Sequence, residues 1–276
     1  MNERAPWALY AVLLAYAVIA LAPFFWMLLT SFKENRDLFR VPPDFRPTLL
    51  FTDTPMVNYA RVWTEGEFVR FFRNSMIVSG LAAIGQAMTC ALAGYAFARM
   101  ELPGKEVLFA VVLATAFVPA EVTIIPEFLI MRQIGWVDTW APLIVPSFLV
   151  GAFGTFMLRE YFGALPDEYG EAAVMDGATP FQIFFRVYLP LARPALTAVF
   201  VVAFINNWDE LLRPLVFLNS PELYTVPLGL LGFFSQFSAA WNQLMAGSVI
   251  SILPLVLIYL LAQRHVLQGF MGGGVK

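Results

Sequence analysis

Long apolar segments, separated by shorter polar ones, dominate the hydrophobic pattern of the chain. A helix that crosses the hydrocarbon of a bilayer needs about 20 mostly apolar residues. The pattern therefore predicts an all-α, polytopic membrane protein that forms one transmembrane domain over residues 1–276. Its six predicted spans cover about residues 8–32, 74–98, 107–130, 141–158, 195–218 and 242–262.

The third apolar segment differs from the others because prolines interrupt it. Pro119 and Pro126 lie beside Glu121 and Glu127, and proline cannot continue a helix without loss of a backbone hydrogen bond. We expect the membrane helix to end near Ala120, with the following residues lying along the membrane interface. A functional role of Glu121 inside the membrane is the less favoured alternative.

Composition agrees with the pattern and excludes several classes of protein. The chain is 59% hydrophobic and 13% charged, whereas a soluble domain is roughly 45–50% apolar and about 25% charged. A net charge of −3 argues against nucleic acid as a partner, since nucleic acid requires a basic face. One cysteine, Cys90, and one histidine, His265, are too few for a cysteine cluster or a multi-histidine metal site, so we expect no metal.

Basic residues favour a cytoplasmic location for both termini. Six crossings place the termini on one side, and Lys and Arg concentrate in cytoplasmic loops. Residues 33–73 carry seven basic residues and oppose this orientation, but we place the N-terminus inside. The inner segments would then hold Arg4, Arg99, Lys105, Arg159, Arg186, Arg193, Arg264 and Lys276.

The polar segment over about 159–193 is predicted to form a helix, a tight turn and a second helix. Pro166 suits a first helical position, and Gly177 can supply the left-handed residue that ends the first helix. Thr179 and Gln182 have the spacing of a capping box, and the second helix should end near Leu189–Pro190.

Two interpretations of this segment follow from the residues alone. Its small residues at the bend would let a compact knob fit a socket on a second protein, and its aromatic residues would give the second helix an apolar face. Alternatively, the segment packs on its own helical bundle. The small residues are Ala172, Ala173, Gly177 and Ala178, and the apolar face comprises Phe181, Phe184, Phe185 and Val187.

The segment resembles the EAA motif of binding-protein-dependent ABC importer permeases. The match comprises Glu171-Ala172-Ala173, Gly177, Val187 where isoleucine is usual, and Leu189-Pro190. The extension over 176–180 is similar to that of the carbohydrate branch, in particular its MalG-like subunit. Further similarities to that subunit are Leu102-Pro103-Gly104-Lys105, Asn207-Trp208-Asp209-Glu210 and the tail Gln268–Lys276.

The resemblance implies a subunit of an ATP-driven importer in the bacterial inner membrane, with half of the translocation pathway for a sugar. It implies four kinds of partner: a MalF-like second permease subunit, a homodimer of MalK-like ATP-binding subunits, an extracytoplasmic sugar-binding protein and membrane lipid. The implied ATPase-coupling residues are Glu171, Ala172, Ala173, Asp176, Gly177, Ala178, Leu189 and Pro190, and a tail with Gly269, Gly274 and Lys276 would contact the ATPase.

The sequence lacks the phosphate-binding motif of an ATPase, which agrees with a permease whose ATP is bound by partner subunits. The sequence contains no G-x-x-x-x-G-K-[ST] phosphate-binding loop, which ATPases of this kind require. We therefore expect a non-enzymatic chain that binds no cofactor, with ATP and Mg²⁺ held by partner subunits.

The fifth apolar segment carries the candidate translocation path, Asn207, Trp208 and Asp209. Amide and carboxylate groups can bond sugar hydroxyls, and an indole can stack on a pyranose ring. The favoured alternative is a structural cluster in which Asp209 pairs with Arg213, since residues four apart share a helix face.

Other functions remain open at this point. The solute of such a permease could be a glycerol phosphodiester or a polyamine rather than a sugar. A secondary transporter should show inverted repeats and ion-binding broken helices, and would not need the EAA segment. A membrane enzyme lacks support, because no paired acid and base, metal site or nucleophile is evident.

Overall fold

The computed structural model describes residues 6–38, 41, 56–64, 67–233 and 240–271, and within these ranges it contains helices and no strand. The chain forms two compact units. Unit 1 comprises residues 1–69 and 229–253, and unit 2 comprises residues 70–228 and 254–276.

Unit 1 is organised around the buried amide of Asn58. Its Nδ2 donates to the carbonyls of Ser31 (2.8 Å) and Lys33 (2.9 Å), and its Oδ1 accepts from Asn242 (2.9 Å). The amide therefore joins the end of one long helix to the start of another. The elements are α1 (Pro6–Ser31), the 3₁₀ turn η1 (Asn35–Asp37), α2 (Val57–Thr64), part of α13 (Val226–Leu231) and the first part of α14 (Trp241–Met271).

Unit 2 is built on the long helix α3 (Phe68–Arg99), all of which except its first two residues belongs to this unit. Around it lie α4 (Lys105–Ala114), η3 (Thr115–Phe117), α5 (Ala120–Gln133), α6 (Ala141–Ile144), η4 (Val145–Phe148) and α7 (Ala152–Ala164). These are followed by α8 (Glu168–Met175), α9 (Pro180–Ile183), the π-segment η5 (Phe184–Tyr188), α10 (Leu189–Leu191), α11 (Arg193–Trp208), α12 (Leu212–Phe217) and η6 (Pro221–Leu223).

Glycines allow the helices of unit 2 to approach closely. A Cβ on Gly94 of α3 would lie 2.9 Å from the backbone nitrogen of Arg159 in α7. A Cβ on Gly154 of α7 would lie 2.8 Å from the Cys90 sulfur and 2.9 Å from a Val199 methyl. Gly80, by contrast, faces open space, so only part of the small-residue pattern marks a helix crossing.

Helices long and apolar enough to cross a bilayer number four in the described part of the chain, or six if each of two bent pairs is one span. The four are Leu9–Ser31, Phe68–Arg99, Ala141–Ala164 and Trp241–Arg264. The bent pairs are Lys105–Phe117 with Ala120–Gln133, at 100°, and Pro180–Leu191 with Arg193–Trp208, at 79°.

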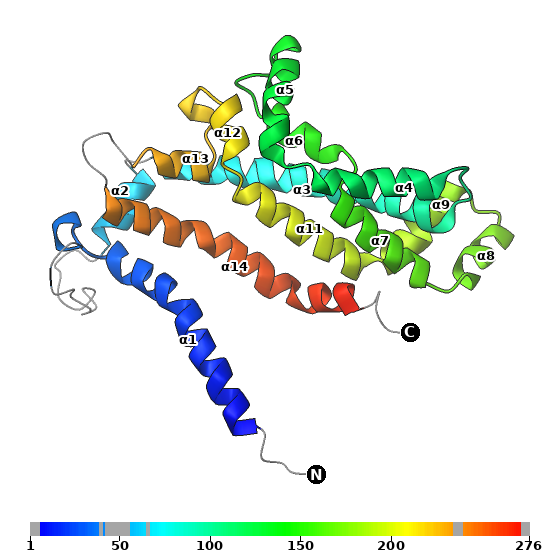
Figure 1. The fold of residues 1–276 in the computed structure, drawn as a ribbon, viewed down its shortest axis with the longest axis horizontal. Coiled ribbons are helices and arrows are strands. Elements are labelled where there is room, and N and C mark those ends of the chain that lie inside the picture. Colours follow the sequence, from blue (N-terminus) through cyan, green and yellow to red (C-terminus); the bar gives the residue numbers. More distant parts are fainter. Residues whose placement is uncertain (1–5, 39–40, 42–55, 65–66, 234–239, 272–276) are drawn as a thin grey trace. The chain divides into compact units, whose positions relative to one another are not determined.

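The break in the third predicted span lies where the prolines indicated. Val118 is extended, as expected of a residue before proline, and Pro119 precedes the first turn of α5. Because the two halves differ in direction by 100°, α5 stands away from α4 in Figure 1. Pro126 does not end α5, which continues to Gln133.

The fifth predicted span, 195–218, is not one continuous helix. α11 ends at Trp208, with Asp209 as its C-cap, and α12 begins only at Leu212. The apolar pattern predicts one continuous helix, but the helical hydrogen bonds are interrupted at the polar residues between α11 and α12.

Candidate functional site

The first helix of the predicted coupling segment, α8, begins later than expected. Leu165 is extended before Pro166, so the chain leaves α7 there and α8 starts at Glu168 after the N-cap Asp167. The prediction that Pro166 occupies the first helical position was wrong, because the helix starts beyond it. Glu168 and Glu171 still lie in the first turn, where negative charge is favourable to the helix dipole.

The turn after α8 has the geometry that its glycine predicts. Gly177 has φ +76°, a left-handed conformation that suits glycine. The amide of Ala178 donates to the Ala173 carbonyl (3.0 Å), and the amide of Gly177 donates to the Val174 carbonyl (2.9 Å). This pair of bonds is a Schellman motif, and it fixes the direction in which the chain leaves α8.

The second helix starts with the predicted capping box. The Gln182 amide donates to the Thr179 hydroxyl (3.4 Å), and the Thr179 amide donates to the Gln182 side-chain oxygen (2.8 Å). α9 then passes through the π-segment η5 into α10, which ends at Leu191. The helix-turn-helix is therefore confirmed as local structure, and its end lies at the predicted Leu-Pro.

The aromatic residues of the second helix support both interpretations, packing on the chain's own bundle and docking on a second protein. Phe184 is buried and packs on Tyr95 and Phe162, with ring centroids 5.1 and 6.4 Å away. Phe181 is 71% exposed and Met175, at the end of α8, is 87% exposed. One side of the segment thus packs on its own bundle, while the turn presents apolar side chains that no described residue covers.

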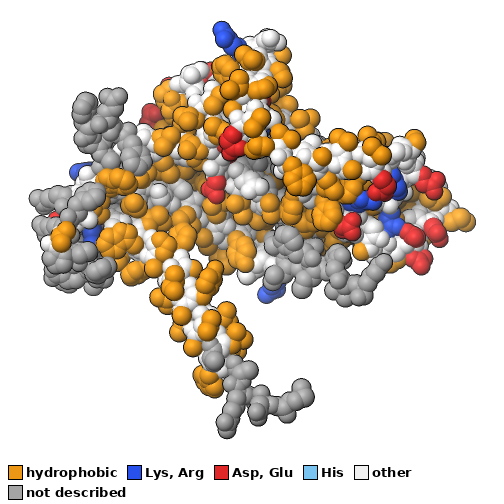
Figure 2. Space-filling view, in the orientation of Figure 1, with side chains coloured by type: hydrophobic (Ala, Val, Ile, Leu, Met, Phe, Trp, Pro, Cys, Tyr) orange, Lys and Arg blue, Asp and Glu red, His pale blue; other side chains and the backbone are white. Residues whose placement is uncertain are grey.

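Charged side chains gather around the same segment. Figure 2 shows Asp, Glu, Lys and Arg side chains at the end of unit 2 that carries α8. Arg99, at the end of α3, forms an ion pair with Asp167 and lies over the Tyr188 ring, 5.1 Å from its centroid. The sequence pattern had marked Arg99 only as a basic residue for topology, because its contacts are 63 and 68 residues away in the chain.

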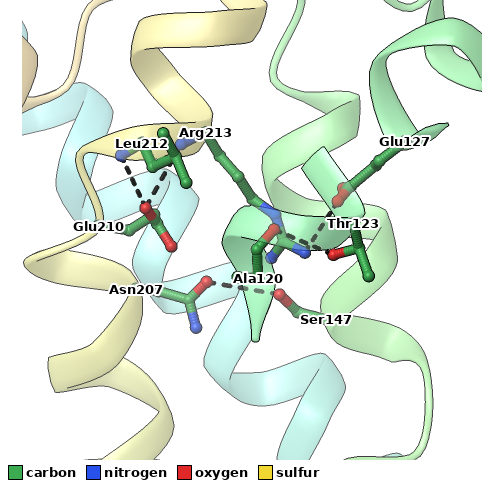
Figure 3. A network of polar contacts seen from close by, with 8 residues as sticks. All are labelled: Ala120, Thr123, Glu127, Ser147, Asn207, Glu210, Leu212 and Arg213. Atoms are coloured by element: carbon green, nitrogen blue, oxygen red, sulfur yellow. Dashed lines mark hydrogen bonds and ion pairs between the residues drawn. The ribbon is translucent and has the colours of Figure 1, made fainter. Parts of the chain in front are cut away.

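A second polar cluster lies where α5, α11 and α12 meet the short turn η4 (Figure 3). Arg213 of α12 pairs with Glu127 of α5 at 3.1 Å. Glu210 accepts bonds from the amides of Leu212 (2.8 Å) and Arg213 (3.3 Å), and so caps α12 with a carboxylate. We call Glu127, Ser147, Asn207, Glu210 and Arg213 the polar network.

The proposed pairing of Asp209 with Arg213 was wrong. It required both residues on one continuous helix, but α11 ends at Trp208, α12 begins only at Leu212, and Arg213 pairs with Glu127. The sequence predicts that the charges pair within one helix. Instead, the Arg213–Glu127 ion pair connects α12 to α5. Glu127 and Ser147 were missed as partners because no short-range spacing connects them to the fifth segment.

The candidate path residues have three different environments. Asn207 donates to the Ala203 carbonyl (2.8 Å), and its oxygen lies 3.4 Å from the Ser147 hydroxyl. Trp208 is 2% exposed, stacked on Phe204. This burial agrees with the favoured alternative, a structural cluster, in which the indole does not stack on a sugar ring. Asp209 caps α11.

The tail predicted to contact the ATPase is only partly described. Gly269 lies in α14, which extends to Met271. Gly274 and Lys276 lie outside the described residues.

Comparison with known proteins identifies the family. The model of the family "Binding-protein-dependent transport system inner membrane component" matches residues 90–271. The chain belongs to this family. This range contains both the coupling segment and the polar network of the permease. Membership decides between the importer permease and the alternatives of a secondary transporter or a membrane enzyme, and makes the permease a non-catalytic, multi-pass subunit of the inner membrane.

Relatives align with the permease over almost its whole length. The inner membrane ABC transporter permease protein YcjP of Escherichia coli (strain K12) is 34% identical, over 97% of this chain and 95% of that protein. The arabinooligosaccharides transport system permease protein AraQ of Bacillus subtilis (strain 168) is 32% identical, over 98% and 95%. The lactose transport system permease protein LacG of Rhizobium radiobacter is 32% identical, over 95% and 94%.

A solved structure shares the fold. A chain of a bacterial ABC transporter involved in the import of the acidic polysaccharide alginate superimposes with a TM-score of 0.80 at 24% identity, covering 96% of the permease and 98% of that chain.

Among the described residues of the permease, no group of three or more His, Cys, Asp and Glu could hold a metal ion.

Proposed function

We propose that the permease forms half of the translocation pathway of an ATP-driven importer for a carbohydrate. The observation that carries this proposal is the similarity, over more than nine-tenths of the chain, to permeases named for arabinooligosaccharides and for lactose. The solute would arrive on an extracytoplasmic sugar-binding protein, and a MalF-like subunit would form the other half of the pathway.

The coupling segment would dock on a MalK-like ATPase subunit. Support comes from its surface: the turn is held by its own hydrogen bonds, and the exposed Met175 and Phe181 flank Gly177. Apolar side chains that stay exposed at a preformed turn are typical of a contact with another protein. Glu171 would lie at that contact, and the tail from Gly269 to Lys276 would reach the same ATPase pair.

This assignment fixes the expected orientation. Both termini and the coupling segment would be cytoplasmic, which agrees with the basic residues near α8. ATP and Mg²⁺ would bind to the partner subunits, and this chain would bind no cofactor.

Uptake by cells that carry altered coupling segments tests the proposal. Gly177→Asp and Glu171→Lys should abolish binding-protein-dependent uptake of a labelled sugar and weaken ATPase co-purification, with normal amounts of permease in the membrane. The matched controls are Gly135→Asp, at an equally open turn with φ +73°, and Glu160→Lys, at an exposed site of α7. Normal uptake in the first two variants would refute the coupling role.

A panel of sugars decides the substrate class. The purified binding protein should bind a mono- or oligosaccharide in calorimetry, and the same sugar should compete for uptake. Binding of a glycerol phosphodiester or a polyamine, with no sugar bound, would overturn the carbohydrate assignment without affecting the importer assignment.

A further inference from the structure

The last residue of α3, Arg99, reaches into the point where α7 ends and the coupling segment begins. Its side chain is 11% exposed. Nε and Nη2 donate to the Phe162 carbonyl at 3.0 and 2.6 Å, and Nη2 also donates to the Leu165 carbonyl. One guanidinium therefore binds the carbonyl end of α7, where a positive charge is favourable to the helix dipole.

The same side chain also contacts both helices of the coupling segment. Nη1 pairs with Asp167, the N-cap of α8. The guanidinium lies over the ring of Tyr188 in η5, and Tyr188 is 3% exposed. Across that ring, a Cβ on Gly170 of α8 would lie 2.7 Å from the Tyr188 hydroxyl, so α8 and η5 are in close contact beside Arg99.

We propose that Arg99 is a positioning residue that fixes the coupling segment to α3. α8 is connected covalently only to α7 and to α9. Arg99 links α8 to α3 through Asp167 and through Tyr188, against which Gly170 of α8 lies. This link adds to the packing of Tyr95 of α3 on Phe184. A displacement of α8 is therefore passed to the 32-residue α3 as well as to its neighbours in the chain. The inference rests on the proposed coupling function for the origin of that displacement.

Arginine is the residue that this position requires. Its planar guanidinium has five donors in fixed directions, and its face can stack on an aromatic ring. Lysine offers a compact charge that cannot reach the two carbonyls, the carboxylate and the ring together. Asp167 is 78% exposed, so the ion pair contributes little, and the carbonyl bonds and the tyrosine contact hold the segment.

Arg159 supplies a matched control. It pairs with Glu106 of α4 at 2.9 Å and lies over Phe109, 4.0 Å from the ring centroid. It therefore also joins two helices of unit 2 through an ion pair and a cation–π contact. Both of these contacts are to α4 and neither is to α8, α9 or η5, so Arg159→Ala tests whether loss of any such arginine has the same effect.

Spin labels on α3 and α8 test the link itself. The labels are placed on Leu92→Cys in α3, where the native side chain is 40% exposed, and on Tyr169→Cys in α8, where it is 49% exposed. The background is Cys90→Ala, and the complete complex is isolated through a tag on this chain. In the unaltered chain we expect one narrow distribution of the distance between the two labels. Arg99→Ala should broaden this distribution about twofold, because the segment is locally released. Arg159→Ala should leave its width unchanged. An equally narrow distribution in Arg99→Ala overturns the inference.

Stimulation of ATP hydrolysis tests transmission through the link. With MgATP and the binding protein as isolated from the host, Arg99→Ala should lower the ratio of stimulated to basal hydrolysis about fivefold, the lower range of coupling between sites. Arg99→Lys should give a smaller loss. ATPase should still co-purify with Arg99→Ala, since the docking surface is intact, whereas a misfolded chain would yield less complex.

The outcomes separate this inference from the proposed function. If Arg99→Ala broadens the distance distribution but leaves stimulation normal while Gly177→Asp abolishes it, the coupling function stands and transmission through Arg99 is refuted. If Gly177→Asp also leaves stimulation normal, the proposed coupling function itself fails.

Discussion

The coupling segment and the polar network satisfy their polar groups in opposite ways. In the turn of the coupling segment, residues 173–182, the bonds are local: Thr179 and Gln182 bond to each other in the capping box, and Ala178 bonds to Ala173. In the polar network the partners are distant in sequence, with Ser147 and Asn207 separated by 60 residues and Glu127 and Arg213 by 86.

The difference shows what each region depends on. A turn held by its own bonds keeps its shape while exposed, which suits a surface that another subunit contacts. The Glu127–Arg213 pair depends on the placement of two helices, and the Oε1 of Glu127 and the Nε of Arg213 are buried with no hydrogen-bond partner among the described residues. Unpaired polar atoms of this kind are costly in a low-dielectric interior, so the network should be the more sensitive region.

The largest expected effect comes from removal of one member of the partly buried Glu127–Arg213 pair. Arg213→Leu leaves the Glu127 carboxylate without its cation. We expect a loss of about 2 kcal/mol in the free energy of unfolding, below the 3–5 kcal/mol typical of full burial, because the side chains are 26% and 14% exposed. Unfolding in detergent, followed by tryptophan fluorescence, measures the loss.

The double variant Glu127→Leu with Arg213→Leu is the control for that prediction. Replacement of both charges by apolar groups is often neutral, so most of the lost stability should return. A double variant as unstable as the single one would show that shape, rather than charge pairing, maintains the network.

The next effect tests the helix packing that carries the coupling segment. Gly94→Ala would place a methyl group against the backbone of α7 at 2.9 Å, and we expect a loss of roughly 1–3 kcal/mol from overpacking. Gly80→Ala in the same helix meets nothing within 4 Å and should stabilise the helix slightly. Equal melting temperatures for the two variants would contradict a close crossing of α3 and α7.

Sequence reasoning succeeded where structure is local. The glycine turn, the capping box and the proline break all follow from residues within a few positions, and all were predicted. The start of α8, the end of α11 and the partner of Arg213 depend on backbone direction and on residues far along the chain, and these predictions were wrong. Arg99 was missed for the same reason, since only the fold brings α3 to the end of α7.

A smaller effect tests the local character of the coupling turn. Gly177→Ala keeps open space around the side chain but forces a left-handed conformation on alanine, which costs about 1 kcal/mol. Gly177→Asn should cost less, because asparagine tolerates that conformation. Hydrogen exchange of the α8 amides measures the loss. Gly163→Ala, in open space within α7, is the control, and equal exchange in all variants would show that the turn needs no glycine.

Asp138 provides the smallest predicted effect and combines features of both regions. It accepts bonds from the Ser220 hydroxyl (2.5 Å) and from the amides of Ser220 and Asn219 (2.9 Å each), partners more than 80 residues away as in the polar network. It nevertheless lies in the loop between α5 and α6, outside the spans. The bond from the Ser220 side chain, followed by those from the two amides, lowers the pKa of the Asp138 carboxyl.

The lowered pKa gives the sign of the pH dependence. The carboxylate is bonded in the folded state, so its contribution is complete above the unfolded-state pKa of about 3.9 and is lost as pH falls toward the lower folded-state value. Protection of the Ser220 amide against hydrogen exchange, corrected for the intrinsic rate, should therefore decrease below about pH 4. Asp138→Asn should show lower protection that does not change over this range. A pH-independent protection in the unaltered chain would mean that the carboxylate does not hold this loop, and that long-range bonds matter in this fold only where they are buried.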